Sequence, residues 1–232
     1  MRTVLVTGGA RRIGAAICRA LAAAGWRVLI HANRSRAEAR ALAAELGGRN
    51  VAPFDLATPE GVEGCFNAAL DAAGGTLDAL VNNASLFGRS PLLESGAEVF
   101  HRFWQVNTLA PITLTRRLAA HLLERGANGA VVQLLDQRIV CPGTGDIPYT
   151  LSKQALAAFT RSAAVELAPA LRVNGVAPGA VLPPENIHEA AGTSPLGTRT
   201  TPEQVASAVR FLLESPFVTG QILFADCGQH LV

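Results

Sequence analysis

The chain has 232 residues, of which 49% are hydrophobic and 16% charged, so a large buried core is expected and disorder is not. A formal net charge of +2 without any block of like charges argues against a nucleic-acid partner. The four cysteines lack C-x-x-C spacing, which predicts neither a metal site nor a disulfide framework. No secretory signal precedes the first strand and charges interrupt every apolar run, so we expect a soluble, cytoplasmic protein.

Short β-branched runs alternate with Ala- and Leu-rich helical stretches along the whole chain. The expected strands are Thr3–Val6, Arg27–Ile30, Val51–Phe54, Leu77–Val81, Ala130–Leu134, Arg172–Val176 and Gln221–Phe224. The expected helices are Ile13–Ala24, Arg36–Leu46, Pro59–Ala73, Ala97–Arg125, Pro148–Leu167 and Pro202–Leu213. Several strands are apolar throughout, as in a parallel sheet covered on both faces. The pattern predicts an α/β fold, with one domain over residues 1–232 and a single Rossmann-type, doubly wound parallel sheet of about seven strands with helices on both faces.

One segment, residues 181–201, breaks this alternation. It is rich in Pro, Gly and Thr and follows a strand, which places it at the sheet edge where open α/β folds bind ligands. A long loop at that edge is expected to contact substrate rather than to link domains. We predict that Val181 and Leu182 are its substrate-binding residues.

The first β–α connection is rich in glycine and reads Thr7-Gly8-Gly9-Ala10-Arg11-Arg12-Ile13-Gly14. Glycines permit a tight turn and let backbone N–H groups approach a pyrophosphate at the helix N-terminus, whose dipole favours anions. A plain β–α connection is the alternative for such a turn taken alone. Its place in the first β–α unit favours a dinucleotide site that includes Gly8, Arg11, Arg12 and Ile13.

The second strand leads into His31-Ala32-Asn33-Arg34-Ser35. A site that prefers NAD would place a carboxylate near here for the ribose 2′-hydroxyl, and none occurs before Glu38. Arg34 and Ser35 instead offer a guanidinium and a hydroxyl suited to a 2′-phosphate. We therefore predict NADPH/NADP as the cofactor, with His31 and Asn33 beside it. The alternative is that Arg34 is a solvated loop residue.

The stretch Tyr149-Thr150-Leu151-Ser152-Lys153 carries the predicted chemistry. Its spacing puts Tyr149 and Lys153 on one face of a helix, one turn apart. A Tyr titrates near about pH 10, and a neighbouring ammonium favours the phenolate and lowers the pKa. Tyr149, the only Tyr in the chain, can then exchange a proton with substrate while nicotinamide supplies or accepts hydride. The alternative is a chance pair on an amphipathic helix.

Taken together, these motifs resemble the short-chain dehydrogenase/reductase family over essentially the whole chain. The resemblance implies a helix-distorting Asn107 that holds a catalytic water, and cofactor contacts from both Tyr149 and Lys153. It also implies assembly as a homo-oligomer, a tetramer. The other cofactor contacts that it implies are Asp55, Leu56, Asn83, Ala84, Ser85, Pro178 and Gly179.

The chain departs from this family at Asp136. Most members place a Ser about a dozen residues before the Tyr, where it hydrogen-bonds the substrate carbonyl. An ionised carboxylate cannot donate to a developing oxyanion, but it accepts from ring N–H groups, or donates a proton if its pKa is raised near Tyr149. This argues against a simple ketone and suits a nitrogen heterocycle. The alternative is that Asp136 is structural.

The pteridine reductases and dihydromonapterin reductases form a branch that shares this substitution. The chain also resembles that branch at Arg12, where most of the larger family has Gly, in the His-x-x-Arg-Ser turn, and in Asn-Ala-Ser-x-Phe. The resemblance implies that Ser85 and Phe87 contact a pterin and that Phe87 stacks on it. It further implies that Arg12 reaches the phosphates and the substrate's polar edge. Taken alone, Phe87 fits a core aromatic equally well.

We therefore expect an NADPH-dependent reductase of a pterin, dihydropterin or dihydrofolate. Tyr149, Lys153, Asp136 and Asn107 are its predicted catalytic residues, and no metal is predicted. A carbonyl reductase of 3-oxoacyl or sugar substrates is one alternative, but it expects Ser or Thr at position 136. A non-catalytic NADP(H)-binding sensor is another, but it predicts decay of the Tyr/Lys pair.

Overall fold

In the computed structural model, which describes residues 1–51, 53–181 and 194–232, seven parallel strands form one sheet. The strands are β1 (Thr3–Val6), β2 (Arg27–His31), β3 (Arg49–Val51), β4 (Ala79–Asn82), β5 (Gly129–Leu134), β6 (Leu171–Pro178) and β7 (Ile222–Ala225). Their order is β3-β2-β1-β4-β5-β6-β7, so the chain builds outward from β1 and then crosses back to β4. The crevice at this reversal is where doubly wound sheets bind ligands. The predicted fold class is confirmed.

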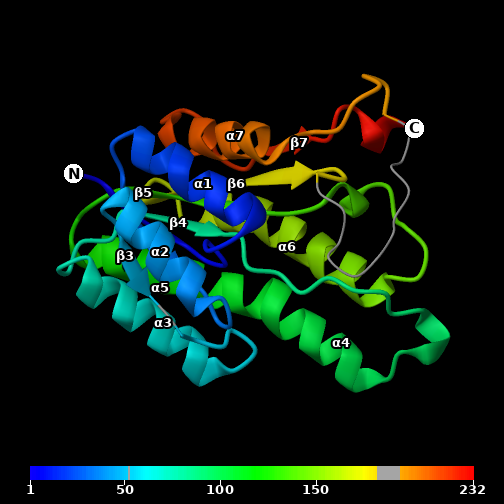
Figure 1. Ribbon diagram of the computed structural model, residues 1–232, viewed down its shortest axis with the longest axis horizontal. Coiled ribbons are helices and arrows are strands. Elements are labelled where there is room, and N and C mark those ends of the chain that lie inside the picture. Colours follow the sequence, from blue (N-terminus) through cyan, green and yellow to red (C-terminus); the bar gives the residue numbers. More distant parts are fainter. Residues whose placement is uncertain (52, 182–193) are drawn as a thin grey trace.

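Helices lie on both faces of the sheet (Figure 1). One face carries α1 (Arg12–Ala23), α2 (Arg36–Leu46) and α7 (Pro202–Glu214). The other carries α3 (Pro59–Ala72), α5 (Ala110–Glu124) and α6 (Ile147–Glu166), with α4 (Ala97–Trp104) packed against α6. The short 3₁₀ helices η1 (Leu92–Glu94) and η3 (Gln137–Ile139) lie in connections between these elements, and η4 (Gln229–Leu231) follows β7. None of the described helices is long and apolar enough to span a membrane.

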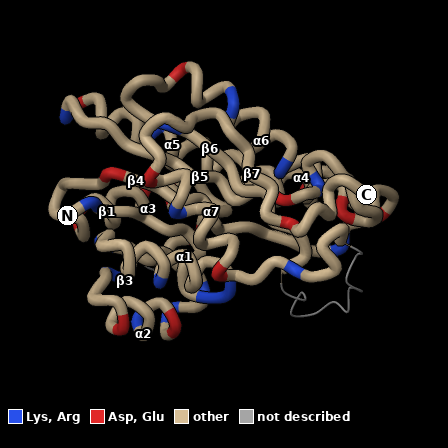
Figure 2. Tube along the Cα trace, turned by 90° about the horizontal axis from the view of Figure 1, so that it is seen from above, with Lys and Arg blue, Asp and Glu red and all other residues tan. Residues whose placement is uncertain are grey.

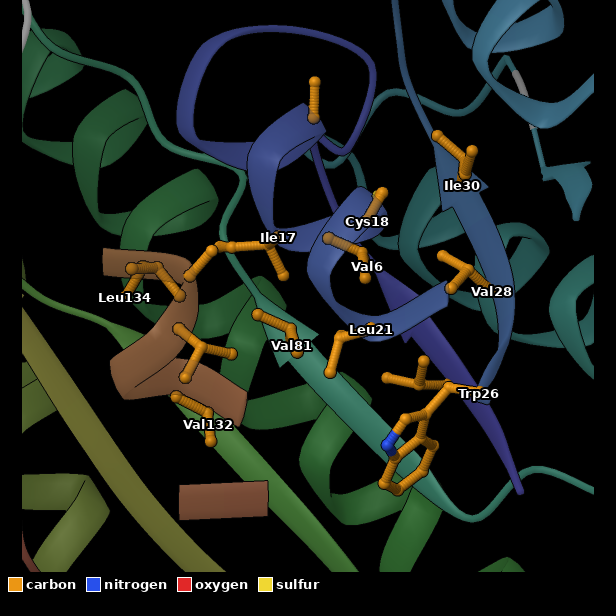
Figure 3. Packing of buried hydrophobic residues seen from close by; sticks show 14 of the residues in the cluster. Val6, Ile17, Cys18, Leu21, Trp26, Val28, Ile30, Val81, Val132 and Leu134 are labelled. Carbon is orange, nitrogen blue, oxygen red and sulfur yellow. The ribbon is translucent and has the colours of Figure 1, made fainter. Parts of the chain in front are cut away.

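The sheet divides the core into two layers because successive side chains of a strand point to opposite faces. Val4 and Val6 of β1 belong to the layer under α1 and α7, whereas Leu5 belongs to the layer under α3 and α5. Figure 3 shows Ile17 and Leu21 of α1 pointing into the first layer, toward side chains of the central strands. Because both faces of the central strands are buried, consecutive positions such as Val4, Leu5 and Val6 are all apolar.

The third strand corrects one prediction. The sequence predicts Val51–Phe54, but β3 spans Arg49–Val51. Pro53 has no N–H to give to a ladder, and the carbonyl of Phe54 lies 3.0 Å from His31 Nε2. That hydrogen bond turns the segment toward the end of β2 instead of extending the strand.

The helix predicted over Ala97–Arg125 is three consecutive elements rather than one. α4 ends at Trp104, a π-helical turn, η2, spans Gln105–Leu109, and α5 continues to Glu124. A π turn accommodates one extra residue in the helical path, and Pro111 cannot donate a hydrogen bond to the turn before it. The distortion expected at Asn107 is therefore present, as a widened turn inside a continuous helical run.

A matched pair of leucines tests the two-layer core. Leu80 of β4 is fully buried, whereas Leu93 of η1 is 100% exposed. We expect Leu80→Ala to lower the free energy of unfolding by about 2–5 kcal/mol, because the buried site cannot collapse around the lost atoms. Leu93→Ala should change it by less than about 0.5 kcal/mol. Urea denaturation measures both, and equal losses would contradict this account of the core.

Candidate active site

A cavity of about 580 Å³ opens at the carboxyl ends of β1, β2 and β4. It lies at the reversal of strand order, where the fold predicts a ligand. Most of the predicted cofactor residues line it, namely Gly8, Arg11, Arg12, Ile13, His31, Asn33, Arg34, Asp55, Leu56, Asn83, Ala84 and Ser85. These residues come from four segments of the chain, the first and last of which lie about 70 residues apart.

The glycine-rich turn is held in shape by the end of β4. Asn83 Nδ2 donates to the carbonyl oxygens of Thr7 and Gly8, at 3.0 and 2.9 Å. Gly8 adopts a φ of +60°, and a Cβ on Gly14 would lie 2.2 Å from the Gly8 carbonyl oxygen. Only glycine fits at position 14, because the helix passes directly against the turn. Asn83 therefore shapes the cofactor turn as well as lining the cleft.

His31 supports the same turn from β2. Its ring is buried, its Nδ1 accepts the Gly8 N–H at 3.2 Å, and its Nε2 lies 3.0 Å from the Phe54 carbonyl oxygen. A carbonyl can only accept, so Nε2 carries the proton and Nδ1 is the acceptor. Burial lowers the pKa of His31, which keeps the ring neutral and suited to this role.

Guanidinium groups gather at the cleft. Acidic and basic residues are interspersed along the described trace (Figure 2), but the cavity is lined by Arg11, Arg12, Arg34 and Arg102, with Asp55 as its one acid among the described residues. This donor set suits an anionic dinucleotide. Arg12 adopts a φ of +53°, a conformation that costs a side-chain-bearing residue roughly 1–2 kcal/mol. The family's usual glycine would relieve that strain but supply no charge.

Five residues that line the cavity are not among the predicted site residues, namely Gly14, Ala57, Leu86, Arg102 and Val106. Arg102 lies on α4 and Val106 on η2. No local motif marks them, because only the packing of α4 and η2 beside the β4 loop brings them to the cleft. Ser35 lies at the start of α2 and is absent from the residues that line the cavity.

The predicted catalytic residues meet where β5 ends and α6 begins. Tyr149 donates its hydroxyl to Asp136 Oδ2 at 2.7 Å, and Asp136 stands two residues beyond β5. Lys153 donates from Nζ to the Leu134 carbonyl oxygen at 2.6 Å. Both Tyr149 and Lys153 are buried. The structure therefore joins Tyr149 directly to Asp136, and Lys153 to the strand that carries Asp136.

The acidity of Tyr149 differs from the prediction. Burial, together with the charge of Asp136 and the hydrogen bond to it, raises the pKa of Tyr149 well above its usual value. The prediction that Lys153 lowers this pKa is wrong, because Lys153 Nζ lies 6.0 Å from the Tyr149 ring centroid and is directed to the main chain. Burial lowers the pKa of Lys153 to about 8. Tyr149 is thus a protonated phenol at neutral pH.

Asn107 is fully occupied by protein partners. Its Oδ1 accepts from the Leu86 N–H at 2.8 Å and the Ser85 hydroxyl at 3.2 Å. Its Nδ2 donates to the Leu86 carbonyl oxygen and to Ser152 Oγ, both at 3.0 Å. These four bonds use the whole capacity of an amide side chain. The side chain therefore clamps the loop after β4 to α6, and a catalytic role for Asn107 stays a prediction.

Phe87 lies beside the reacting hydroxyl and not in the core. Its side chain is 41% exposed, and its ring meets the Tyr149 ring edge-on with centroids 4.9 Å apart. The core-aromatic interpretation is therefore wrong. The exposed ring offers a flat apolar surface next to the phenol, as stacking of a planar substrate requires.

The remaining predicted residues follow β6. Gly179 donates its N–H to the Ala225 carbonyl oxygen, and a Cβ there would lie 2.2 Å from Gln229 Oε1. Pro178 ends the strand, and Val181 is buried just beyond it. Leu182 and most of the predicted substrate loop, residues 181–201, lie outside the described residues. The contacts predicted for these residues stay predictions.

A buried charged pair beside Tyr149 was also missed. Arg138 Nε lies 2.7 Å from Asp146 Oδ2, and Arg138 Nη1 lies 3.6 Å from Asp136 Oδ2. Asp146 immediately precedes α6 and accepts from the Thr150 hydroxyl at 3.1 Å. Asp at a helix N-terminus is a sequence signal for a cap, but it gives no indication that a partner arrives from another loop.

The hydroxyl of Tyr149 can be removed by substitution without changing the residues that line the cofactor cleft. Tyr149→Phe should lower kcat by about 10²–10⁴-fold, because the substrate loses its positioned proton donor. NADPH binding, measured by fluorescence, should stay nearly intact, since the cavity is lined by other residues. An equal loss of turnover and NADPH binding would contradict the role assigned to Tyr149.

Comparison with known proteins identifies relatives along the full length. A family model described as enoyl-(acyl carrier protein) reductase matches residues 8–230. Carbonyl reductase family member 4 of Danio rerio is 35% identical, with 100% of this chain and 99% of that protein covered. Pteridine reductase 1 of Leishmania tarentolae is 34% identical, with 98% of this chain and 96% of that protein covered.

A solved structure agrees in fold. FolM alternative dihydrofolate reductase 1 from Brucella suis, in complex with NADP, is 38% identical and superimposes with a TM-score of 0.91. The match covers 100% of this chain and 96% of that one. Relatives with carbonyl and with pterin substrates in their names thus resemble the chain about equally in sequence.

Proposed function

Because the chain belongs to the short-chain dehydrogenase/reductase family of oxidoreductases, we propose that it is an NADPH-dependent reductase of a dihydropterin or dihydrofolate. One observation carries the choice of substrate: the hydroxyl of Tyr149 donates to a carboxylate, Asp136, where a carbonyl reductase of this family would present a second neutral donor. An ionised carboxylate repels a developing oxyanion and accepts from ring N–H and amino groups. The exposed ring of Phe87 adds a stacking surface for a planar heterocycle.

The residues divide the reduction of a C=N bond between them. NADPH, when bound, supplies the hydride that the ring carbon receives. Tyr149 supplies the proton to the ring nitrogen, since its raised pKa keeps the hydroxyl protonated at neutral pH. Asp136 orients that hydroxyl and accepts from the N–H groups of the substrate. Lys153 donates to the Leu134 carbonyl oxygen and so holds the end of β5, two residues before Asp136.

NADPH is the proposed form of the cofactor. Arg34 lines the cleft just beyond β2, and the lining contains no carboxylate at that point to bind a ribose 2′-hydroxyl. The FolM structure that resembles this chain was solved with NADP, which supports the same choice.

The contribution of Arg34 can be separated from general cofactor binding. Arg34→Met should weaken NADPH binding roughly tenfold to a hundredfold, from the loss of about 1.5–3 kcal/mol of hydrogen bonding to a charged group. NADH binding should be unchanged. Arg40→Met, on the exposed side of α2, is the matched control. Equal loss of NADPH and NADH binding would contradict a 2′-phosphate contact.

The substrate class is tested by NADPH oxidation with purified protein. We expect turnover of dihydromonapterin, dihydrobiopterin or dihydrofolate and none of a panel of ketones. Asp136→Ser should lower kcat/KM for the dihydropterin about ten- to a hundredfold, because a charge-assisted contact is lost. Asp71→Ser, at an exposed site on α3, is the control. Unchanged pterin kinetics in Asp136→Ser would remove the main argument for this substrate.

A carbonyl reductase is the second candidate function. The identity of 35% to carbonyl reductase family member 4 favours it, and Tyr149 and Lys153 would serve it equally well. Turnover of ketones alone would establish it and would leave the fold, the cofactor and the roles of Tyr149 and Lys153 unchanged. A non-catalytic sensor of NADP(H) would turn over neither class, although the Tyr/Lys pair is intact. Assembly as a homotetramer and a cytoplasmic location stay predictions.

A further inference from the structure

Arg138 lies close to three of the residues around Tyr149, namely Asp136, Asp146 and Phe87. It belongs to η3, which immediately follows Asp136. Its main-chain N–H donates to Asp136 Oδ1 at 2.9 Å, and its Nη1 lies 3.6 Å from Asp136 Oδ2. Both carboxylate oxygens of Asp136 are thereby fixed by one residue, with Oδ2 shared between Arg138 and Tyr149.

The guanidinium of Arg138 also contacts the ring of Phe87. Arg138 Cζ lies 5.3 Å from the centroid of the Phe87 ring, within the range of a cation–π contact. Phe87 in turn meets Tyr149 edge-on. Asp136, Arg138, Phe87 and Tyr149 therefore form a closed cycle of contacts, in which each side chain touches the next.

The far side of Arg138 is anchored to α6. Its Nε lies 2.7 Å from Asp146 Oδ2, and Asp146 Oδ1 accepts a hydrogen bond from the Thr150 hydroxyl. The side chains of Arg138 and Asp146 are 17% and 7% exposed, so water screens this pair weakly. A Cβ at Gly143 would lie 3.0 Å from Arg138 Nε and 3.1 Å from Asp146 Oδ2, so the chain leaves just enough room for the pair.

We propose that Arg138 is a positioning residue of the reaction, which acts through Asp136, Phe87 and Tyr149 without touching the reacting atoms. It holds the carboxylate as an acceptor, keeps the aromatic ring beside the phenol, and compensates the negative charge of Asp136 and Asp146. The inference rests on the proposed function for its effect on turnover. Its effect on Tyr149 can be measured without any substrate.

The charges that face Tyr149 give the direction of this effect. They are Asp136 after β5, Arg138 in η3, Asp146 before α6 and Lys153 on α6, while Phe87 and Phe103 supply apolar contacts. Asp136 and Asp146 raise the pKa of Tyr149, and Arg138 lowers it. Removal of the guanidinium therefore raises the pKa of Tyr149 further.

Tyr149 is the only tyrosine of the chain, so it can be observed alone. Protein labelled with 3-fluorotyrosine gives one ¹⁹F resonance, which can be followed from neutral to alkaline pH. In Arg138→Met the transition to tyrosinate should move to higher pH, because the cation that favours the tyrosinate is lost. Arg138→Lys, which keeps the charge and loses the forked geometry, should lie between wild type and Arg138→Met. Arg161→Met, at an exposed position of α6, should match wild type.

The steady-state kinetics of the same variants provide a second test of the role of Arg138. With a dihydropterin, Arg138→Met should lower kcat about ten- to a hundredfold, as expected for misplaced groups, with the KM for NADPH unchanged and partial recovery in Arg138→Lys. A ¹⁹F titration and kcat equal to wild type would overturn the proposal, as would equal losses of turnover and NADPH binding. If Arg138→Met fails to fold, Arg138→Lys decides by the same two criteria. If wild type turns over no pterin, the proposed function fails, and the ¹⁹F titration still decides the role of Arg138.

Discussion

The hydrogen bond from Tyr149 to Asp136 joins the end of a central strand to the first turn of a helix, and much of the site exists to hold it. A buried carboxylate is costly unless it is paired and hydrogen-bonded. Asp136 meets that requirement with the Tyr149 hydroxyl, the Arg138 N–H and the Arg138 guanidinium. With Asp146 and Lys153 included, two acids and two bases occupy the pocket, so a charge-balanced cluster surrounds the phenol.

In the cofactor cleft, neutral side chains fix the backbone of the surrounding turns, and charged side chains line the cavity. Asn83 and His31 hydrogen-bond the glycine-rich turn, and Asn107 joins the loop after β4 to α6. Such satisfied networks are rigid, because any displacement leaves a buried polar group without a partner. The backbone of Arg12 is strained, and a glycine would form the same turn with less strain. The arginine, however, adds a guanidinium to the lining of the cavity.

Sequence reasoning succeeds here where a short-range rule determines the result. The periods of strands and helices predict the sheet, and the spacing of Tyr149 and Lys153 places both on one helix face. It fails where the outcome depends on packing between distant segments. Arg138 and Arg102 carry no local signature, and β3 ends before Phe54 because His31 takes the carbonyl that a longer strand would have needed. The acidity of Tyr149 was predicted with the wrong sign because spacing reveals the nearby Lys but not burial or the carboxylate bonded to the hydroxyl.

Lys153 is the one lysine among the 20 Lys and Arg residues of the chain, and it is buried. An arginine stays charged at any accessible pH, so it suits the cleft and the contact of Arg138 with two carboxylates. A buried lysine can release its proton near neutral pH, and the pKa of Lys153 is lowered to about 8. Tyr149, by contrast, holds its proton tightly. Of the two side chains on this face of α6, Tyr149 therefore keeps its proton at neutral pH, and Lys153 is the one whose pKa lies close to it.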